Sequence, residues 1–286
     1  MDDTDFSLFG QKNKHKKDKA DATQIARTPT SELDLKRIII SRSTTEDTYE
    51  NCARAGIALI FNHKDVKGQK QRVGTERDRD DMQATLKGFG FDVRTYDDLT
   101  FSDINDKLKE GQGVAKDMSY PVERLWNPFL GDNCKTLKNK PKLFFIQACR
   151  GENLEKAVEF TSFAVMTREL VPDTAAPVQP ITYAIPSTAD MLVFYSTFDK
   201  FFSFRNVDDG SWFIQSLCRV LDVAAANEAS QPEGAELLRL LTAVNRKVAY
   251  EYQSNTKNEA LNQMKEMPNF MSTLTKTFNL RVKPKT

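Results

Sequence analysis

The stretch KLFFIQACRG, residues 142–151, decides the fold class. It opens with an apolar run that Pro141 precedes and Gly151 ends, as expected of a strand buried on both faces. Such strands are typical of parallel sheets covered by helices. A side chain that directly follows one is held rigidly at the carboxyl edge of the sheet, where α/β proteins bind ligands. Cys149 follows this strand, although a cysteine there, taken alone, more often packs than reacts.

Strands alternate with helices on both sides of this stretch. The apolar periods predict strands over 56–62, 91–96 and 191–197, helices over 77–87, 101–110, 211–226 and 234–253, and a last apolar segment over 278–282. Ser102 or Asp103 is expected to cap the second helix. This order predicts an α/β fold with a mostly parallel sheet and helices on both faces.

Two regions have the composition of exposed chain. Residues 1–50 are polar and include a lysine-rich stretch at 12–19, which predicts a flexible leader. Residues 159–184 contain three prolines and predict an exposed connector.

Charge and cysteine content exclude several classes of protein. The 286 residues carry 41 Lys and Arg against 40 Asp and Glu, a balance that argues against nucleic-acid or membrane-surface binding. No apolar run is long enough for a membrane span, and residues 1–5 do not begin a signal peptide, so we expect a cytoplasmic protein. The four cysteines form no CxxC pair or metal-type cluster and are expected to be reduced thiols.

Several motifs resemble one family. Gln147-Ala148-Cys149-Arg150-Gly151 matches the signature of caspases, the C14 family of peptidases. Four further segments resemble caspase segments in the same order: QRVGT at 71–75, YST at 195–197, FSFRN at 202–206 and GSWFIQSL at 210–217. The resemblance runs from about Gly56 to the C-terminus and is strongest to the short-leader effector caspases of insects.

The resemblance implies an endopeptidase that cleaves protein substrates after aspartate during programmed cell death. Cys149 would be the nucleophile, and the chemistry would need no metal or organic cofactor. Cleavage would separate a large subunit, 51–173, from a small subunit, 174–286, within one caspase domain that forms a homodimer or a heterodimer with another caspase. Asp173 is the best candidate for that processing site, while Asp18, Asp21 and Asp34 are weaker candidates for leader removal.

The same resemblance assigns a substrate site. Arg72, Gln147 and Arg205 fall on the residues that hold the substrate aspartate, and guanidinium groups suit this task because they bind carboxylates bidentately. Neighbouring subsites would be lined by Phe202, Phe204, Asn206 and Trp212, although aromatic residues at such spacings are more often core.

One family feature is missing. Caspases pair the cysteine with a histidine in a His-Gly dipeptide roughly 50 residues upstream, whereas the only histidines here are His15 and His63 and neither precedes glycine. Both flanks of residues 108–114 resemble the family, yet the end of a helix, a central strand and the His-Gly turn are absent between them. We therefore expect a sheet that lacks one interior strand and a chain that is inactive or severely impaired.

Three explanations of the missing His-Gly segment remain open. Alternative splicing or a gene model could have omitted a segment of an active caspase. The chain could be a pseudo-caspase that regulates an active caspase by dimerisation or substrate binding. Finally, another base could serve Cys149, for which His63 is the only histidine outside the lysine-rich leader.

Overall fold

The computed structural model describes residues 48–50, 55–68, 70–109, 123–150, 153–156, 186–227 and 233–283. The connector expected over 159–184 lies outside these ranges, as does the leader up to residue 47. The same is true of His15 and of all four proposed cleavage sites, namely Asp18, Asp21, Asp34 and Asp173.

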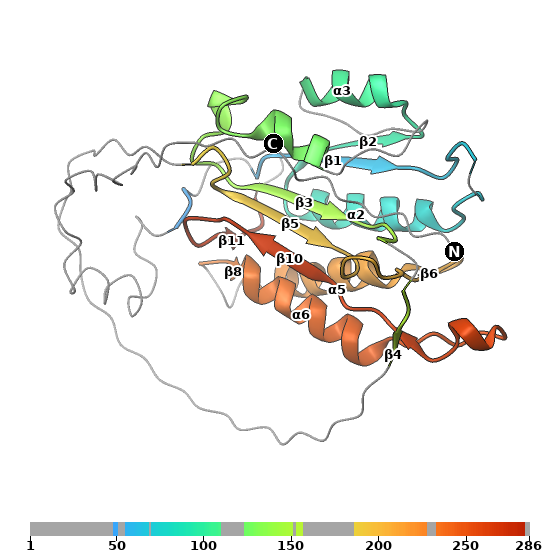
Figure 1. Ribbon diagram of the computed structural model, residues 1–286. Helices are drawn as coiled ribbons and strands as arrows, with labels where there is room; N and C mark the ends of the chain where they lie inside the picture. Colours follow the sequence, from blue (N-terminus) through green and yellow to red (C-terminus); the bar gives the residue numbers. More distant parts are fainter. Residues whose placement is uncertain are drawn as a thin grey trace, which may run out of the picture. The chain divides into compact units, whose positions relative to one another are not determined.

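Five main strands form two hydrogen-bonded ladders (Figure 1). In the first, β1 (Ile57–Asn62) pairs in parallel with β2 (Asp92–Asp97). In the second, β5 (Met191–Tyr195) lies between the parallel β3 (Lys142–Ile146) and the antiparallel β10 (Asn269–Ser272). The mostly parallel arrangement is confirmed. Among the residues that the structure describes, no ladder joins β1 to β3.

Helices cover both faces of these strands (Figure 1), as predicted. Side chains of β3 and β5, including Phe145 and Phe194, pack in one core with α2 (Thr75–Gly88), α5 (Trp212–Ala226) and α6 (Leu237–Glu251). Phe144 points to the opposite face, because side chains alternate along a strand. There it contacts the rings of Trp126 and Phe129.

The second face is covered by shorter elements. Trp126 ends α4 (Glu123–Trp126), and Phe129 ends the 3₁₀ helix η1 (Asn127–Phe129). Phe129 also packs against Ile104 of α3 (Phe101–Lys109). No helix in the described part of the chain is both long and apolar enough to cross a membrane.

The remaining elements are two or three residues long, and no sequence period predicts them. β10 was missed as well, because two of its four side chains are exposed. The short elements are η2 (Lys135–Leu137), η4 (Glu259–Leu261) and the paired strands β4 (Glu155–Lys156) with β9 (Met264–Lys265), β6 (Arg205–Asn206) with β7 (Gly210–Ser211), and β8 (Ala235–Glu236) with β11 (Asn279–Leu280).

Two local predictions need correction. β5 is buried along its whole length, whereas β3 is only half-buried beyond Lys142, because no described strand pairs with its outer edge. The expected cap of α3 at Ser102 or Asp103 was wrong. Thr100 caps this helix, since its hydroxyl accepts from Asp103 N at 3.3 Å while Thr100 N donates to the Asp103 carboxylate at 3.1 Å.

Tyr49 anchors the first described residues to the sheet. Its buried hydroxyl donates to Oδ1 of Asp190 at 2.6 Å and accepts from Thr275 N at 3.1 Å. Asp190 is only 1% exposed, so its carboxylate depends on such donors. Burial, aided by the bond to Asp190, raises the pKa of Tyr49 to about 12.

Replacing this hydroxyl should destabilise the fold. We expect Tyr49→Phe to lower the free energy of unfolding by about 2 kcal/mol, because it takes a donor from a buried carboxylate and an acceptor from Thr275 N. Urea denaturation measures the loss. Tyr250→Phe is the matched control, since Tyr250 is 63% exposed. Equal losses in the two variants would contradict the anchoring role of Tyr49.

Candidate functional site

Cys149 lies in an exposed loop three residues after β3 ends. Its Sγ donates to the carbonyl oxygen of Ser203 at 3.5 Å. The loop is tied to the end of β5, because Ala148 N donates to Ser196 Oγ at 3.3 Å and the same hydroxyl donates to Ala148 O at 3.1 Å. The thiol is therefore accessible while its backbone is held.

Two arginines from distant segments converge on this region. Arg72 follows β1, and its Nη1 donates to the carbonyl oxygen of His63 at 3.0 Å. Arg205 Nε donates to the carbonyl oxygen of Val73 at 2.9 Å, which ties β6 to the loop that carries Arg72. Burial lowers the pKa of Arg72, and the nearby charge of Arg205 lowers it further, whereas Cys149 acts in the opposite direction. The two guanidinium groups and the thiol thus lie within electrostatic reach of one another.

Gly74 allows this close approach. It precedes α2 with φ of 87°, a backbone conformation that glycine adopts without strain. A Cβ at this position would lie 2.7 Å from the carbonyl oxygens of both Asn206 and Val207. The glycine therefore lets the turn after β6 pack directly against the start of α2.

Gln147 joins the same group through Ser203. Its Nε2 donates to Ser203 Oγ at 2.8 Å. Its Oε1 is buried and receives no hydrogen bond from any residue that the structure describes. Arg72, Gln147 and Arg205, which the sequence assigned to one site, are thus connected through Cys149, Ser203 and the loop after β1.

The aromatic residues form a row beside Cys149. Phe204 stacks on Trp212 with ring centroids 4.6 Å apart, and Phe202 lies 6.2 Å from Phe204. Sequence reasoning missed Tyr252, whose ring lies 5.5 Å from Trp212. Phe202 is 36% exposed, so this row presents apolar surface to solvent.

Asn206, which the resemblance assigns to a substrate subsite, also stabilises a local turn. Its Oδ1 accepts from Asp208 N at 2.8 Å and from Asp209 N at 3.4 Å. These bonds close the turn between β6 and β7. Asn206 is exposed beside the site, with its side-chain oxygen engaged in this turn.

Three acids that sequence reasoning missed lie near the site; Asp78 and Glu266 are buried and Glu155 is half-buried. Asp78 of α2 accepts from Ser211 N at 2.8 Å, and burial raises its pKa. Glu266, which follows β9, is 1% exposed, and burial raises its pKa to about 8. Burial also raises the pKa of Glu155. Their positions have no sequence signal, because only tertiary packing buries them.

The second histidine of the sequence, His63, follows β1, and both of its ring nitrogens are buried. The sulfur of Cys149 donates to the carbonyl oxygen of Ser203. Buried ring nitrogens are poorly placed to exchange protons with a substrate.

The comparison with protein families decides the assignment. A sequence model of the caspase domain (Peptidase_C14) matches residues 55–118 and 109–279. The chain belongs to the caspase family. It is therefore a member of a family of cysteine endopeptidases.

Known caspases are similar over most of their length. The chain is 34% identical over 252 residues to Caspase-1 of Spodoptera frugiperda, covering 79% of this chain and 78% of that protein. It is 35% identical over 246 residues to Caspase-3 of Mus musculus, covering 77% and 82% respectively. The crystal structure of Spodoptera frugiperda Caspase-1 superposes with a TM-score of 0.71 at 31% identity, over 86% of this chain and 97% of that one.

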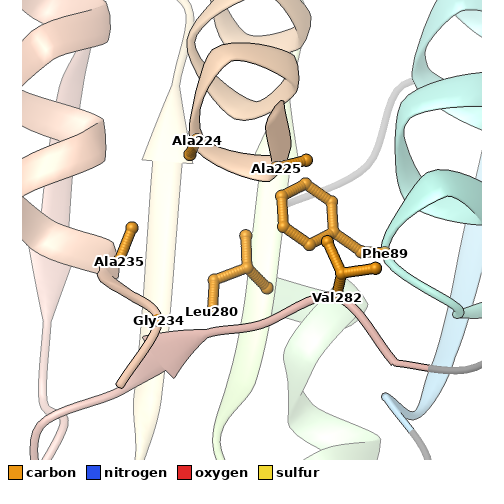
Figure 2. Close-up of a pocket in the computed structure, with 7 residues that line it drawn as sticks. All are labelled: Phe89, Ala224, Ala225, Gly234, Ala235, Leu280 and Val282. Carbon is orange, nitrogen blue, oxygen red and sulfur yellow. The ribbon is translucent and has the colours of Figure 1, made fainter. Parts of the chain in front are cut away.

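Two other features of the described part of this caspase-family chain do not form a second site. A small pocket (Figure 2) contains only apolar side chains and none of the predicted site residues; it is lined by Phe89, Ala224, Ala225, Gly234, Ala235, Leu280 and Val282. Within the described ranges, no group of His, Cys, Asp and Glu side chains could hold a metal ion.

Proposed function

We propose that this caspase-family chain binds protein segments at an aspartate side chain but cleaves them very slowly or not at all. The observation that carries the first half is the convergence of Arg72, Arg205 and Gln147 beside Cys149. The two arginines supply planar charged donors, and the buried amide of Gln147 supplies a neutral one. Such a set suits a single carboxylate. The proposed setting is programmed cell death in the cytoplasm, with Cys149 as the reduced thiol.

The second half rests on the missing proton carrier. The sequence contains only His15 and His63, and the ring nitrogens of His63 are buried. A carbonyl oxygen, which is the partner of the Cys149 thiol, is too weak a base to generate thiolate. The chain therefore keeps a nucleophile without the base that would activate it.

Three observations support the loss of a segment relative to active caspases. The family model matches in two parts that overlap at residues 109–118, which include most of the stretch 108–114 where the sequence departs from the family pattern. The alignment with Spodoptera Caspase-1 has 252 positions but takes in only 79% of this chain, so some positions fall opposite gaps here. In the described part of the fold, β1 and β3 share no ladder, as expected where an interior strand is missing.

A regulatory role is the second candidate. β10 is the last strand of its ladder, and Met271 on this strand is 55% exposed. An edge strand with an apolar side chain favours pairing with another chain. A chain that pairs with an active caspase through β10, or that holds its substrates, would regulate it without cutting.

Aspartate binding can be tested without turnover. A rhodamine-labelled Asp-Glu-Val-Asp peptide with an amidated C-terminus should bind the full chain at pH 7, as measured by fluorescence anisotropy. We expect Arg205→Ala to weaken binding about 100-fold, because it removes one of two charges that face the carboxylate. Arg205→Lys should recover only part of the loss, since an ammonium group lacks the bidentate geometry.

Two controls make this test specific. The peptide that ends in Asn instead of Asp should bind weakly to the wild type and respond little to Arg205→Ala. Arg219→Ala changes an exposed arginine of α5 and should leave binding unaltered. Equal affinity of the wild type for the two peptides would overturn the proposal.

A further inference from the structure

Glu266 is connected to the candidate aspartate site by one intervening residue. Its Oε2 accepts from the backbone N–H of Phe204. The preceding residue, Ser203, accepts from Gln147 Nε2 through its Oγ at 2.8 Å. The buried acid therefore lies against the same segment that binds the amide of Gln147.

The environment of the Glu266 carboxyl group disfavours its charged form. Oε1 is buried and has no hydrogen-bond partner among the residues that the structure describes. An ionised carboxylate has about four acceptor sites and needs donors for them when buried. Here the backbone N–H of Phe204 reaches Oε2 while Oε1 has no donor, so the charged form would remain poorly solvated.

The charged groups around Glu266 also disfavour its ionisation. Asp78 of α2 and Glu155 of β4 are both acids, and each raises the pKa of Glu266. The arginine of β6, Arg205, acts on Asp78. The neighbouring lysine of β9, Lys265, donates its Nζ to the carbonyl oxygen of Tyr252. Burial is the largest cause, and together these effects place the pKa near 8.

We propose that Glu266 controls the affinity of the aspartate site through the charge of its carboxyl group, which must be neutral for tight binding. Ionisation puts a negative charge behind the segment of Ser203, Phe204 and Arg205. The new charge opposes the substrate carboxylate that Arg72 and Arg205 attract. This inference rests on the proposed function.

The prediction is that peptide binding depends on the charge of Glu266. In the full chain with Cys149→Ala, which removes the thiol and its chemistry, affinity for the aspartate peptide should fall about tenfold between pH 7 and pH 9. Glu266→Gln keeps an oxygen for Phe204 N and cannot ionise, so its affinity should stay constant across this range. Glu155→Gln is the matched control, because Glu155 is a half-buried acid on the neighbouring β4 whose pKa burial also raises. It should retain the decline.

Each outcome decides between the claims. Binding that is specific for aspartate but has the same pH profile in wild type and Glu266→Gln overturns the role of Glu266 and leaves the proposed function standing. A pH-independent affinity in Glu155→Gln would assign the pH dependence to Glu155 and would also overturn the role of Glu266. Failure of the wild type to prefer aspartate over asparagine at pH 7 removes the site itself and the inference with it. Should Glu266→Gln not fold, a wild-type affinity that is constant from pH 7 to pH 9 is sufficient to overturn the inference.

Discussion

The purified chain is expected to hydrolyse a fluorogenic acetyl-Asp-Glu-Val-Asp peptide no faster than its Cys149→Ala variant. A cysteine nucleophile needs a base to become a thiolate and an acid to protonate the leaving amine. Here the thiol donates to the carbonyl oxygen of Ser203, and the ring nitrogens of His63 are buried. Loss of the general base alone lowers turnover by about 10⁴-fold or more in enzymes of this type.

The expected loss is larger because a second catalytic device is affected. The resemblance places one oxyanion donor in the His-Gly turn that this chain lacks, and one such donor contributes about 10²–10³-fold in rate. An active caspase, such as Caspase-1 of Spodoptera frugiperda, serves as the positive control in the same assay. Turnover that Cys149→Ala abolishes would contradict the prediction, and His63→Gln would then show whether this histidine acts as the base.

The order of the main strands and helices could be predicted because apolar residues recur periodically in their sequences. The apolar run before Cys149 and the run over 191–197 gave β3 and β5, and the spacing of Met82 and Leu86 gave α2. β10 could not be predicted. It has no alternation of its own, and its place depends on hydrogen bonds to β5.

The candidate site likewise contains residues that the sequence predicts and residues that it does not. Arg72, Gln147 and Arg205 lie in segments that resemble family motifs, so their proximity was predictable before any coordinates. Glu266 was not, because a single glutamate between Lys265 and Met267 has no pattern that distinguishes it from a surface residue. Its burial follows from the fold, because its Oε2 accepts from Phe204 N and the preceding strand β9 pairs with β4. The burial of Glu266 and its raised pKa therefore arise from the fold and have no signal in the sequence.

Burial of Glu266 should be visible in the pH dependence of stability. The pKa of this group is raised from its ordinary value of 4.5 to about 8 in the folded chain. Between these two pH values the unfolded chain has released the proton while the folded chain retains it. The unfolded state therefore binds fewer protons, and the free energy of unfolding decreases as pH rises through this window. Above about pH 8 both states are ionised, and the cost is complete.

Glu266→Gln should remove this cost and its pH dependence. We expect the variant to match the wild type within about 1 kcal/mol at pH 5 and to exceed its free energy of unfolding by about 3–5 kcal/mol at pH 8. Urea denaturation of both chains at pH 5, 6, 7 and 8 measures the difference. Glu259→Gln, an exposed position in η4, should show no such trend. A constant difference between Glu266→Gln and wild type at all four pH values would mean that the carboxyl group ionises freely in the folded chain. Glu266 would then already be charged at pH 7, so this measurement tests the proposed control of the aspartate site without any ligand.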